Sequence, residues 1–152
     1  MRPYFDSGFL FKLYWRESNS AAAWRRLQDF APPLLISRFN EIEIVQSARR
    51  KTWLRGADGL PQMTGEQFEA GMALFEQGLR RGRIIRQPLD YEAVFDWAGE
   101  LSRRFGHLHP IKTADLLHVA LLEFGFDHLV TADKQQYEFA LRAGYSADLL
   151  PP

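Results

Sequence analysis

The sequence of 152 residues contains no cysteine. This absence excludes disulfide bonds, zinc sites with cysteine ligands and thiol catalysis. Long hydrophobic runs are also missing, so no segment is predicted to span a membrane, and the first residues do not resemble a secretion signal. From these absences we expect a cytoplasmic protein with no membrane partner.

The chain has no excess of charge of either sign, with 19 basic and 19 acidic residues. Dedicated nucleic-acid-binding proteins are usually basic, so this balance argues against strong nonspecific binding. Apolar residues, in contrast, make up 46% of the sequence and can form a sizeable core. The length is that of one ordinary domain, and we predict a single domain over residues 1–152.

Short apolar runs alternate with segments of helical spacing along the whole chain. The runs are bounded by turn residues, and because they are continuously apolar we read them as buried strands of a mostly parallel sheet. The predicted strands are 3–5, 34–37, 83–86, 127–131 and 149–150. A turn is predicted at residues 7–8, and helices are predicted at 9–14, 21–30, 38–54, 64–79, 91–105, 113–124 and 134–143. This alternation predicts an α/β fold.

Four acidic residues follow the predicted strands or begin helices. Asp6 directly follows the first strand and Asp133 follows the fourth, while Glu43 lies less than two helical turns after the second. Asp115 lies in the first turn of its own helix, where the helix dipole favours the ionised form. Since ligands of open α/β sheets bind beyond the carboxyl ends of the strands, we expect these acids to converge.

Converging carboxylates repel one another unless a cation lies between them. Mg²⁺ and Mn²⁺ prefer carboxylate and water ligands, and such ions neutralise a phosphodiester and activate water for its hydrolysis. We therefore predict that Asp6, Glu43, Asp115 and Asp133 are both metal ligands and catalytic residues.

Each acid also has an ordinary structural interpretation. Asp6 could cap the helix that follows it, although the next serine is equally able to do so. Asp133 is a good N-cap, and Gln136 would complete a capping box with it. Asp115 could serve only as a helix-start charge, and Glu43 by itself would be an ordinary helix residue. The metal site is inferred from the four acids together.

Two segments in the first third of the chain resemble a known family. Residues 4–14 are similar to the opening of PIN-domain nucleases of the VapC toxin type, in which an aspartate ends the first strand. Residues 37–48 resemble their second motif, where a glutamate stands six residues after a serine or threonine. That pattern selects Glu43 over its neighbour Glu41.

Two later segments complete the resemblance. Residues 113–120 and 130–135 are similar to the third and fourth motifs of the family, and the four motifs occur in the family's order. Two features depart from the pattern: Gly8 stands where serine or alanine is commoner, and the segment at 64–79 makes the chain longer than the shortest members.

The resemblance implies a three-layer α/β/α sandwich around a parallel sheet of about five strands. It also implies an endoribonuclease that depends on Mg²⁺ or Mn²⁺ and hydrolyses phosphodiester bonds in RNA. VapC-type members are toxins that a small VapB-type antitoxin holds inactive, and they commonly form homodimers. We therefore expect an RNA substrate, an antitoxin partner and a homodimer.

Several other residues are candidates for supporting roles. The hydroxyl groups of Ser7 and Thr131 flank two of the acids, and the resemblance suggests that they support the site, although ordinary turn hydrogen bonds are an equal alternative. We expect His118 to be an interior histidine rather than a site residue.

A basic group lies about two turns beyond Glu43. Arg49, Arg50 and Lys51 could contact the RNA backbone, although a solvated helix face explains such a run at least as well.

Two other functions compete with the nuclease. A phosphatase of the haloacid-dehalogenase type needs a second aspartate two residues after Asp6, and the glycine at that position rules it out. A non-catalytic PIN-like module that binds RNA or an antitoxin remains the alternative.

Overall fold

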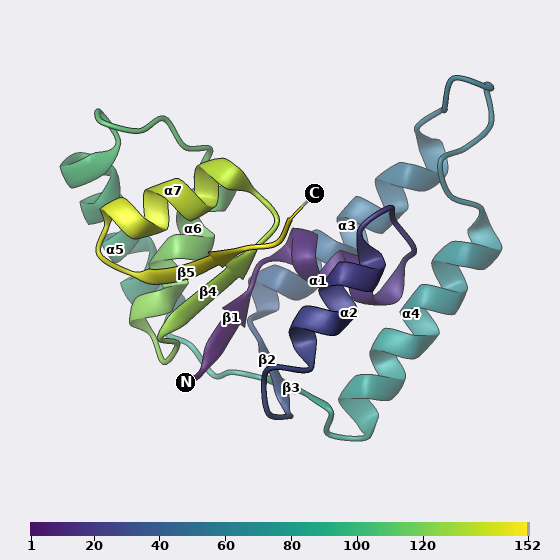
Figure 1. Ribbon diagram of the computed structural model, residues 1–152, viewed down its shortest axis with the longest axis horizontal. Helices are drawn as coiled ribbons and strands as arrows, with labels where there is room; N and C mark the ends of the chain where they lie inside the picture. Colours follow the sequence, from purple (N-terminus) through teal and green to yellow (C-terminus); the bar gives the residue numbers. More distant parts are fainter. Residues whose placement is uncertain (152) are drawn as a thin grey trace. The chain divides into compact units, whose positions relative to one another are not determined.

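A computed structural model describes residues 1–151 and shows a mixed α/β protein whose strands all pair in parallel (Figure 1). The predicted α/β class is thereby confirmed. In chain order the elements are β1 (Pro3–Phe5), α1 (Ser7–Tyr14), α2 (Ser20–Leu27), β2 (Leu34–Ile36), α3 (Arg38–Trp53), α4 (Gly65–Arg80), β3 (Ile84–Arg86), α5 (Tyr91–Phe105), α6 (Thr113–Ala120), the 3₁₀ turn η1 (Leu121–Glu123), β4 (His128–Thr131), α7 (Lys134–Arg142) and β5 (Ser146–Leu149).

The chain divides into two compact units. The first comprises residues 1–6 and 87–151 and contains a sheet of order β1-β4-β5 together with α5, α6 and α7. Strand β4 lies in the middle of this sheet, and all four of its residues are buried. Phe5 pairs with Val130, so the residues that follow both strands emerge at the same edge of the sheet.

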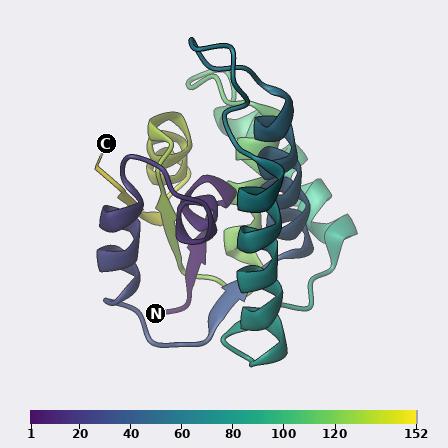
Figure 2. The ribbon, with the colours of Figure 1, turned by 90° about the vertical axis from the view of Figure 1, so that its right-hand side faces the viewer.

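The second unit comprises residues 7–86. It contains α1 to α4 and a parallel pair formed by β2 and β3. Helices α3 and α4 pack side by side and are joined by residues 54–64 (Figure 2). The five expected strands are thus present, but in the described residues they form one sheet of three strands and one of two, since β2 and β3 hydrogen-bond only to each other.

Most element boundaries agree with the sequence prediction. Helix α4 begins at the capping box of Thr64 and Gln67, and α5 begins and ends at the predicted residues. The last strand begins three residues earlier than predicted, at Ser146, because its alternating polar and apolar residues do not form a continuous apolar run. Local signals such as caps and apolar runs therefore place the elements well.

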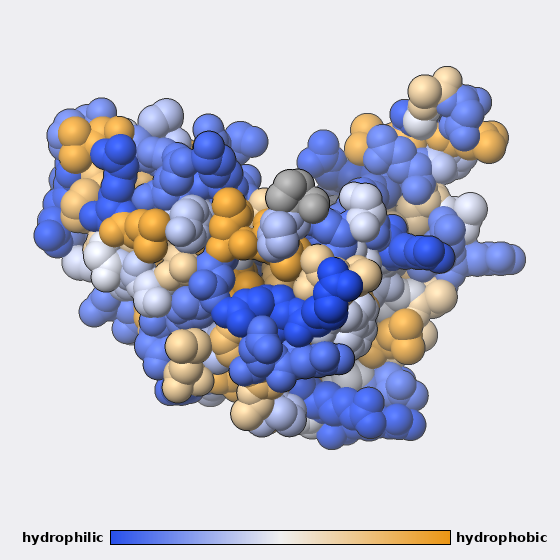
Figure 3. Space-filling model, viewed as in Figure 1, coloured by the Kyte–Doolittle hydropathy of each residue, from blue (hydrophilic) through white to orange (hydrophobic). Residues whose placement is uncertain are grey.

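No helix within residues 1–151 has the length and apolar character needed to cross a membrane. The surface in Figure 3 is mostly hydrophilic, with apolar side chains scattered over it. Apolar side chains lie on the loop between α3 and α4, at the upper right of the view, where Leu54 and Leu60 are exposed.

Candidate active site

Asp6 lies where β1 ends, in the first unit. Its backbone N–H donates to the carbonyl oxygen of Val130 at 3.1 Å, which continues the parallel ladder by one residue. The residue is 4% exposed, and its Oδ2 accepts a hydrogen bond from the hydroxyl of Thr131 on the neighbouring strand. The register of β1 and β4 therefore joins the first predicted acid to a predicted supporting residue.

Thr131 links Asp6 to a second acid. Its Oγ1 accepts from the backbone N–H of Asp133 at 2.9 Å while it donates to Asp6. Asp133 in turn accepts at Oδ1 from the backbone N–H of Gln136 at 3.0 Å, which makes it the N-cap of α7. One fully buried hydroxyl thus holds both acids at the carboxyl edge of the sheet.

Asp115 is joined to the same group through Gln136. It lies in the first turn of α6, as predicted, and its Oδ1 is 3.5 Å from Nε2 of Gln136. The predicted capping box between Asp133 and Gln136 is wrong in its second half. The backbone N–H of Asp133 is taken by Thr131, so the Gln136 side chain is directed to Asp115 instead.

Three of the four predicted acids are therefore connected inside one unit. Hydrogen bonds run from Asp6 through Thr131 to Asp133, and from there through Gln136 to Asp115. The sequence did not predict that Gln136 contacts Asp115. The signal that could have indicated it is a polar residue on the same helix face as Phe139 and Ala140, which are buried.

Glu43 belongs to the second unit, where it is half-buried on α3. That helix begins at Ser37, which forms a capping box with Asn40 and thereby orients the first turns. Glu41, the neighbour that the motif did not select, is engaged elsewhere. It accepts two hydrogen bonds from Arg86 of β3, at 2.9 and 2.8 Å, and this guanidinium lowers the pKa of the Glu41 carboxyl.

The remaining candidate Ser7 and the histidine His118 have identifiable contacts. The Ser7 hydroxyl accepts from the side-chain amide of Asn40 at 3.4 Å. His118 is 3% exposed, and its Nδ1 is 2.6 Å from the hydroxyl of Tyr4, so it is the interior histidine that we expected.

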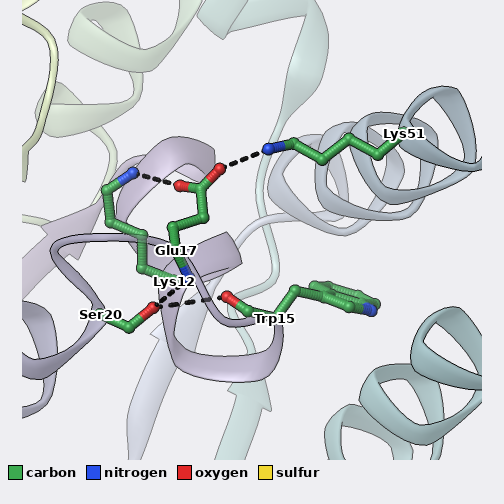
Figure 4. Close-up of polar contacts among 5 residues, drawn as sticks. All are labelled: Lys12, Trp15, Glu17, Ser20 and Lys51. Atoms are coloured by element: carbon green, nitrogen blue, oxygen red, sulfur yellow. Dashed lines mark hydrogen bonds and ion pairs between the residues drawn. The ribbon is translucent and has the colours of Figure 1, made fainter. Parts of the chain in front are cut away.

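The basic group on α3 is largely engaged within its own unit. The guanidinium of Arg49 lies over the ring of Phe68, 3.8 Å from its centroid. The ammonium group of Lys51 is 2.6 Å from Glu17, whose other oxygen pairs with Lys12 at the same distance (Figure 4). Arg50 is exposed and has no ion pair with any of residues 1–151.

Burial by itself raises the pKa of Glu17, but Lys12 and Lys51 together outweigh it and hold that pKa below its ordinary value. Such a carboxylate stays ionised and keeps both lysines in place. Lys51 therefore has a structural role in addition to the RNA contact predicted for it.

The donor atoms of the first unit fit a hard divalent cation. They are carboxylate oxygens from three aspartates, a hydroxyl and a carboxamide, which are the oxygen ligands that such ions prefer. The Oε1 atom of Gln136 is buried and has no hydrogen-bond partner among the described residues. An unpaired buried acceptor costs about 1–3 kcal/mol, and a cation or its water would remove that cost.

As they stand, no three His, Asp or Glu side chains within residues 1–151 are grouped closely enough to hold a metal ion. Thr131 and Gln136 lie between the carboxylates and connect them. Hydrogen bonds thus bring the three carboxylates into one neighbourhood at the carboxyl edge of the sheet.

The fold and this neighbourhood define an α/β protein with an acidic candidate site at the carboxyl ends of its parallel strands. The family model described as "PIN domain" matches residues 4–141, and the chain belongs to the PIN domain family. PIN domains are generally nucleases, and PIN nucleases generally use divalent metal ions.

A solved structure shares the fold. The "Crystal Structure of FitAcB from Neisseria gonorrhoeae" is similar with a TM-score of 0.64 and 14% sequence identity, and the alignment covers 95% of this chain and 95% of that chain. No curated protein sequence matches the chain significantly.

Proposed function

We propose that this protein is an endoribonuclease that hydrolyses RNA phosphodiester bonds with Mg²⁺ or Mn²⁺. The observation that carries the proposal is the hydrogen-bonded series that links Asp6, Asp133 and Asp115 at the carboxyl edge of the sheet. Membership of the PIN family supports it. Glu43 is included as the fourth acid because it occupies the glutamate position of the family's second motif.

The proposed metal ligands are Asp6, Glu43, Asp115 and Asp133. A bound divalent cation would supply charge neutralisation for the phosphodiester and activation of water. The residues of the chain supply the positioning. Thr131 holds the carboxylate of Asp6 in one orientation, so that this ligand need not be ordered when the cation arrives. By analogy with the family, the products carry a 5′-phosphate and a 3′-hydroxyl.

We further propose that the protein is the toxin of a VapBC-type pair. The support is the resemblance of all four motifs to VapC-type members, which implies a small antitoxin partner and a homodimer. The cytoplasmic location is proposed from the composition of the sequence. Arg50 is the best placed of the three basic residues for RNA, because it is exposed and makes no ion pair within the described chain.

The proposal is tested by removing one carboxylate charge at a time. Asp6→Asn and Asp115→Asn should each reduce RNA cleavage at least 100-fold while the far-UV circular dichroism stays that of the wild type, and EDTA should abolish wild-type cleavage. Asp96→Asn is the matched control, because Asp96 is exposed on α5 and outside the acidic neighbourhood. Its cleavage rate should be unchanged.

Two results would contradict the proposal. Full activity of both Asn variants, or cleavage that persists in EDTA, would exclude the metal-dependent mechanism. A wild-type protein that binds RNA or an antitoxin but neither binds Mn²⁺ nor cleaves RNA would instead support the non-catalytic PIN-like module.

A further inference from the structure

Gln136 is the least expected polar residue of the first unit. It is 1% exposed and lies on the face of α7 that also buries Phe139 and Ala140. An apolar side chain at this position could pack against the same neighbours without desolvating an amide. The presence of a carboxamide in this place therefore requires an explanation beyond packing.

The two ends of the carboxamide have different surroundings. The amide nitrogen of Gln136 is directed to the carboxylate of Asp115. The opposite orientation would place the amide oxygen next to a carboxylate oxygen, and two acceptors repel each other. The oxygen is buried and has no hydrogen-bond partner within residues 1–151. Buried polar atoms are almost always paired, so an unpaired one indicates a missing ligand or water.

The only other unpaired buried side-chain atom in the described residues is the indole nitrogen of Trp15. That atom lies in the second unit, where the indole packs closely against Gly71. This packing explains its position. No such contact explains the oxygen of Gln136, which lies next to an acid proposed as a metal ligand.

We propose that Gln136 is a further residue of the cation site. Its Nε2 holds the carboxylate of Asp115, and its Oε1 provides a neutral oxygen to the same divalent cation, directly or through one ordered water. A neutral donor adds coordination without adding to the repulsion among the carboxylates. Gln136 is thus a positioning residue for Asp115 and a ligand-site residue. This inference rests on the proposed function.

The test compares Mn²⁺ affinity with the stability of the metal-free protein. Gln136→Met keeps the length of the side chain and removes both polar atoms, while Gln136→Glu keeps an oxygen donor. Gln135→Met is the matched control on the exposed side of the same helix. Mn²⁺ dissociation constants are measured by isothermal titration calorimetry and by the electron paramagnetic resonance signal of free Mn²⁺, and Tm is measured in EDTA.

We expect Gln136→Met to weaken Mn²⁺ binding about 10-fold or more, as for other residues that orient metal ligands, without lowering the Tm in EDTA. Gln136→Glu should have a lower Tm in EDTA, because two carboxylates then face each other, and a larger rise of Tm on adding Mn²⁺. Gln135→Met should match the wild type in both measurements. If Gln136→Met does not fold, the Mn²⁺-dependent rise of Tm in Gln136→Glu decides the matter.

The outcomes separate this inference from the proposed function. Equal Mn²⁺ affinity of the wild type and Gln136→Met, or no larger Mn²⁺-dependent rise of Tm in Gln136→Glu than in the wild type, would overturn the role of Gln136 and leave the proposed function intact. A wild-type protein that binds no Mn²⁺, with Asp115→Asn indistinguishable from it, would overturn the proposed function and this inference with it.

Discussion

Thr131 donates its hydroxyl hydrogen to Oδ2 of Asp6, although 125 residues separate the two in the sequence. The parallel register of β1 and β4 creates this contact, because it aligns Phe5 with Val130 and leaves the next residue of each strand adjacent. The same hydroxyl oxygen accepts from the backbone of Asp133. One side chain therefore orders two of the proposed metal ligands.

The first prediction concerns this hydroxyl. Thr131→Val keeps the shape of the side chain but leaves Asp6 without its donor and the N–H of Asp133 without its acceptor. Because these groups are buried or partly buried, the variant should be less stable by about 1–3 kcal/mol in urea unfolding at pH 7. Thr131→Ser, which retains the hydroxyl, should recover more than half of that loss. Equal stability of the valine variant and the wild type would contradict the assigned role.

The second prediction separates Glu43 from Glu41, which are two residues apart on α3. If Glu43 is the catalytic acid, Glu43→Gln should reduce RNA cleavage at least 100-fold, with little change in the urea midpoint. Glu41→Gln should leave RNA cleavage nearly unchanged and lower the urea midpoint, since it breaks the pair with Arg86 that joins α3 to β3. Cleavage rates and unfolding midpoints of the two variants, measured in parallel, decide between them. Loss of cleavage in Glu41→Gln alone would show that the motif selected the wrong glutamate.

The third prediction is a pH dependence that arises from Glu17. Its folded pKa lies below the ordinary value of 4.5, so its contribution to stability is present above that pH and is lost as the pH falls through the folded pKa. Glu17→Gln should be less stable than the wild type by about 1 kcal/mol at pH 7, since partly exposed pairs are screened. The difference should shrink towards zero at acidic pH, below 4.5.

The control for this pH dependence is Glu69→Gln. Glu69 is exposed on α4 and has no ion pair within residues 1–151. The free energy of unfolding of Glu69→Gln should equal that of the wild type at each pH from neutral to acidic. A Glu17→Gln variant whose deficit stays constant over the same range would show that the two lysines do not stabilise the ionised carboxylate.

The fourth prediction compares two helical glycines. A Cβ added at Gly71 would lie 2.2 Å from the indole nitrogen of Trp15, whose side chain is buried, so Gly71→Ala should destabilise the protein by about 1–3 kcal/mol. Gly99 lies inside α5 with no atom within 4 Å of such a Cβ. Gly99→Ala should therefore stabilise it by about 0.5–1 kcal/mol. Thermal and urea unfolding of both variants check the opposite signs, and a neutral Gly71→Ala would mean that Trp15 repacks freely.

Much of the fold could be predicted from local pattern. Strands and helix caps each depend on a few neighbouring residues. This holds for the apolar runs at β1, β2 and β4 and for the caps at Thr64 and Asp133, from which the helix boundaries follow. The positions of Asp6 and Asp133 after their strands were also predictable, because each acid follows the end of a continuous apolar run.

The α/β class, the order of the elements and the acids that follow strands can thus be predicted from local patterns. Which side chains meet depends on the tertiary structure. The capping box at Asp133 fails because Thr131 takes the backbone N–H, and Gln136 meets Asp115 from a different helix. Lys51 is paired with Glu17, 34 residues away, rather than left to solvent. Local patterns report what each segment prefers in isolation, whereas these contacts depend on how strands register and helices pack, which no short window of sequence contains.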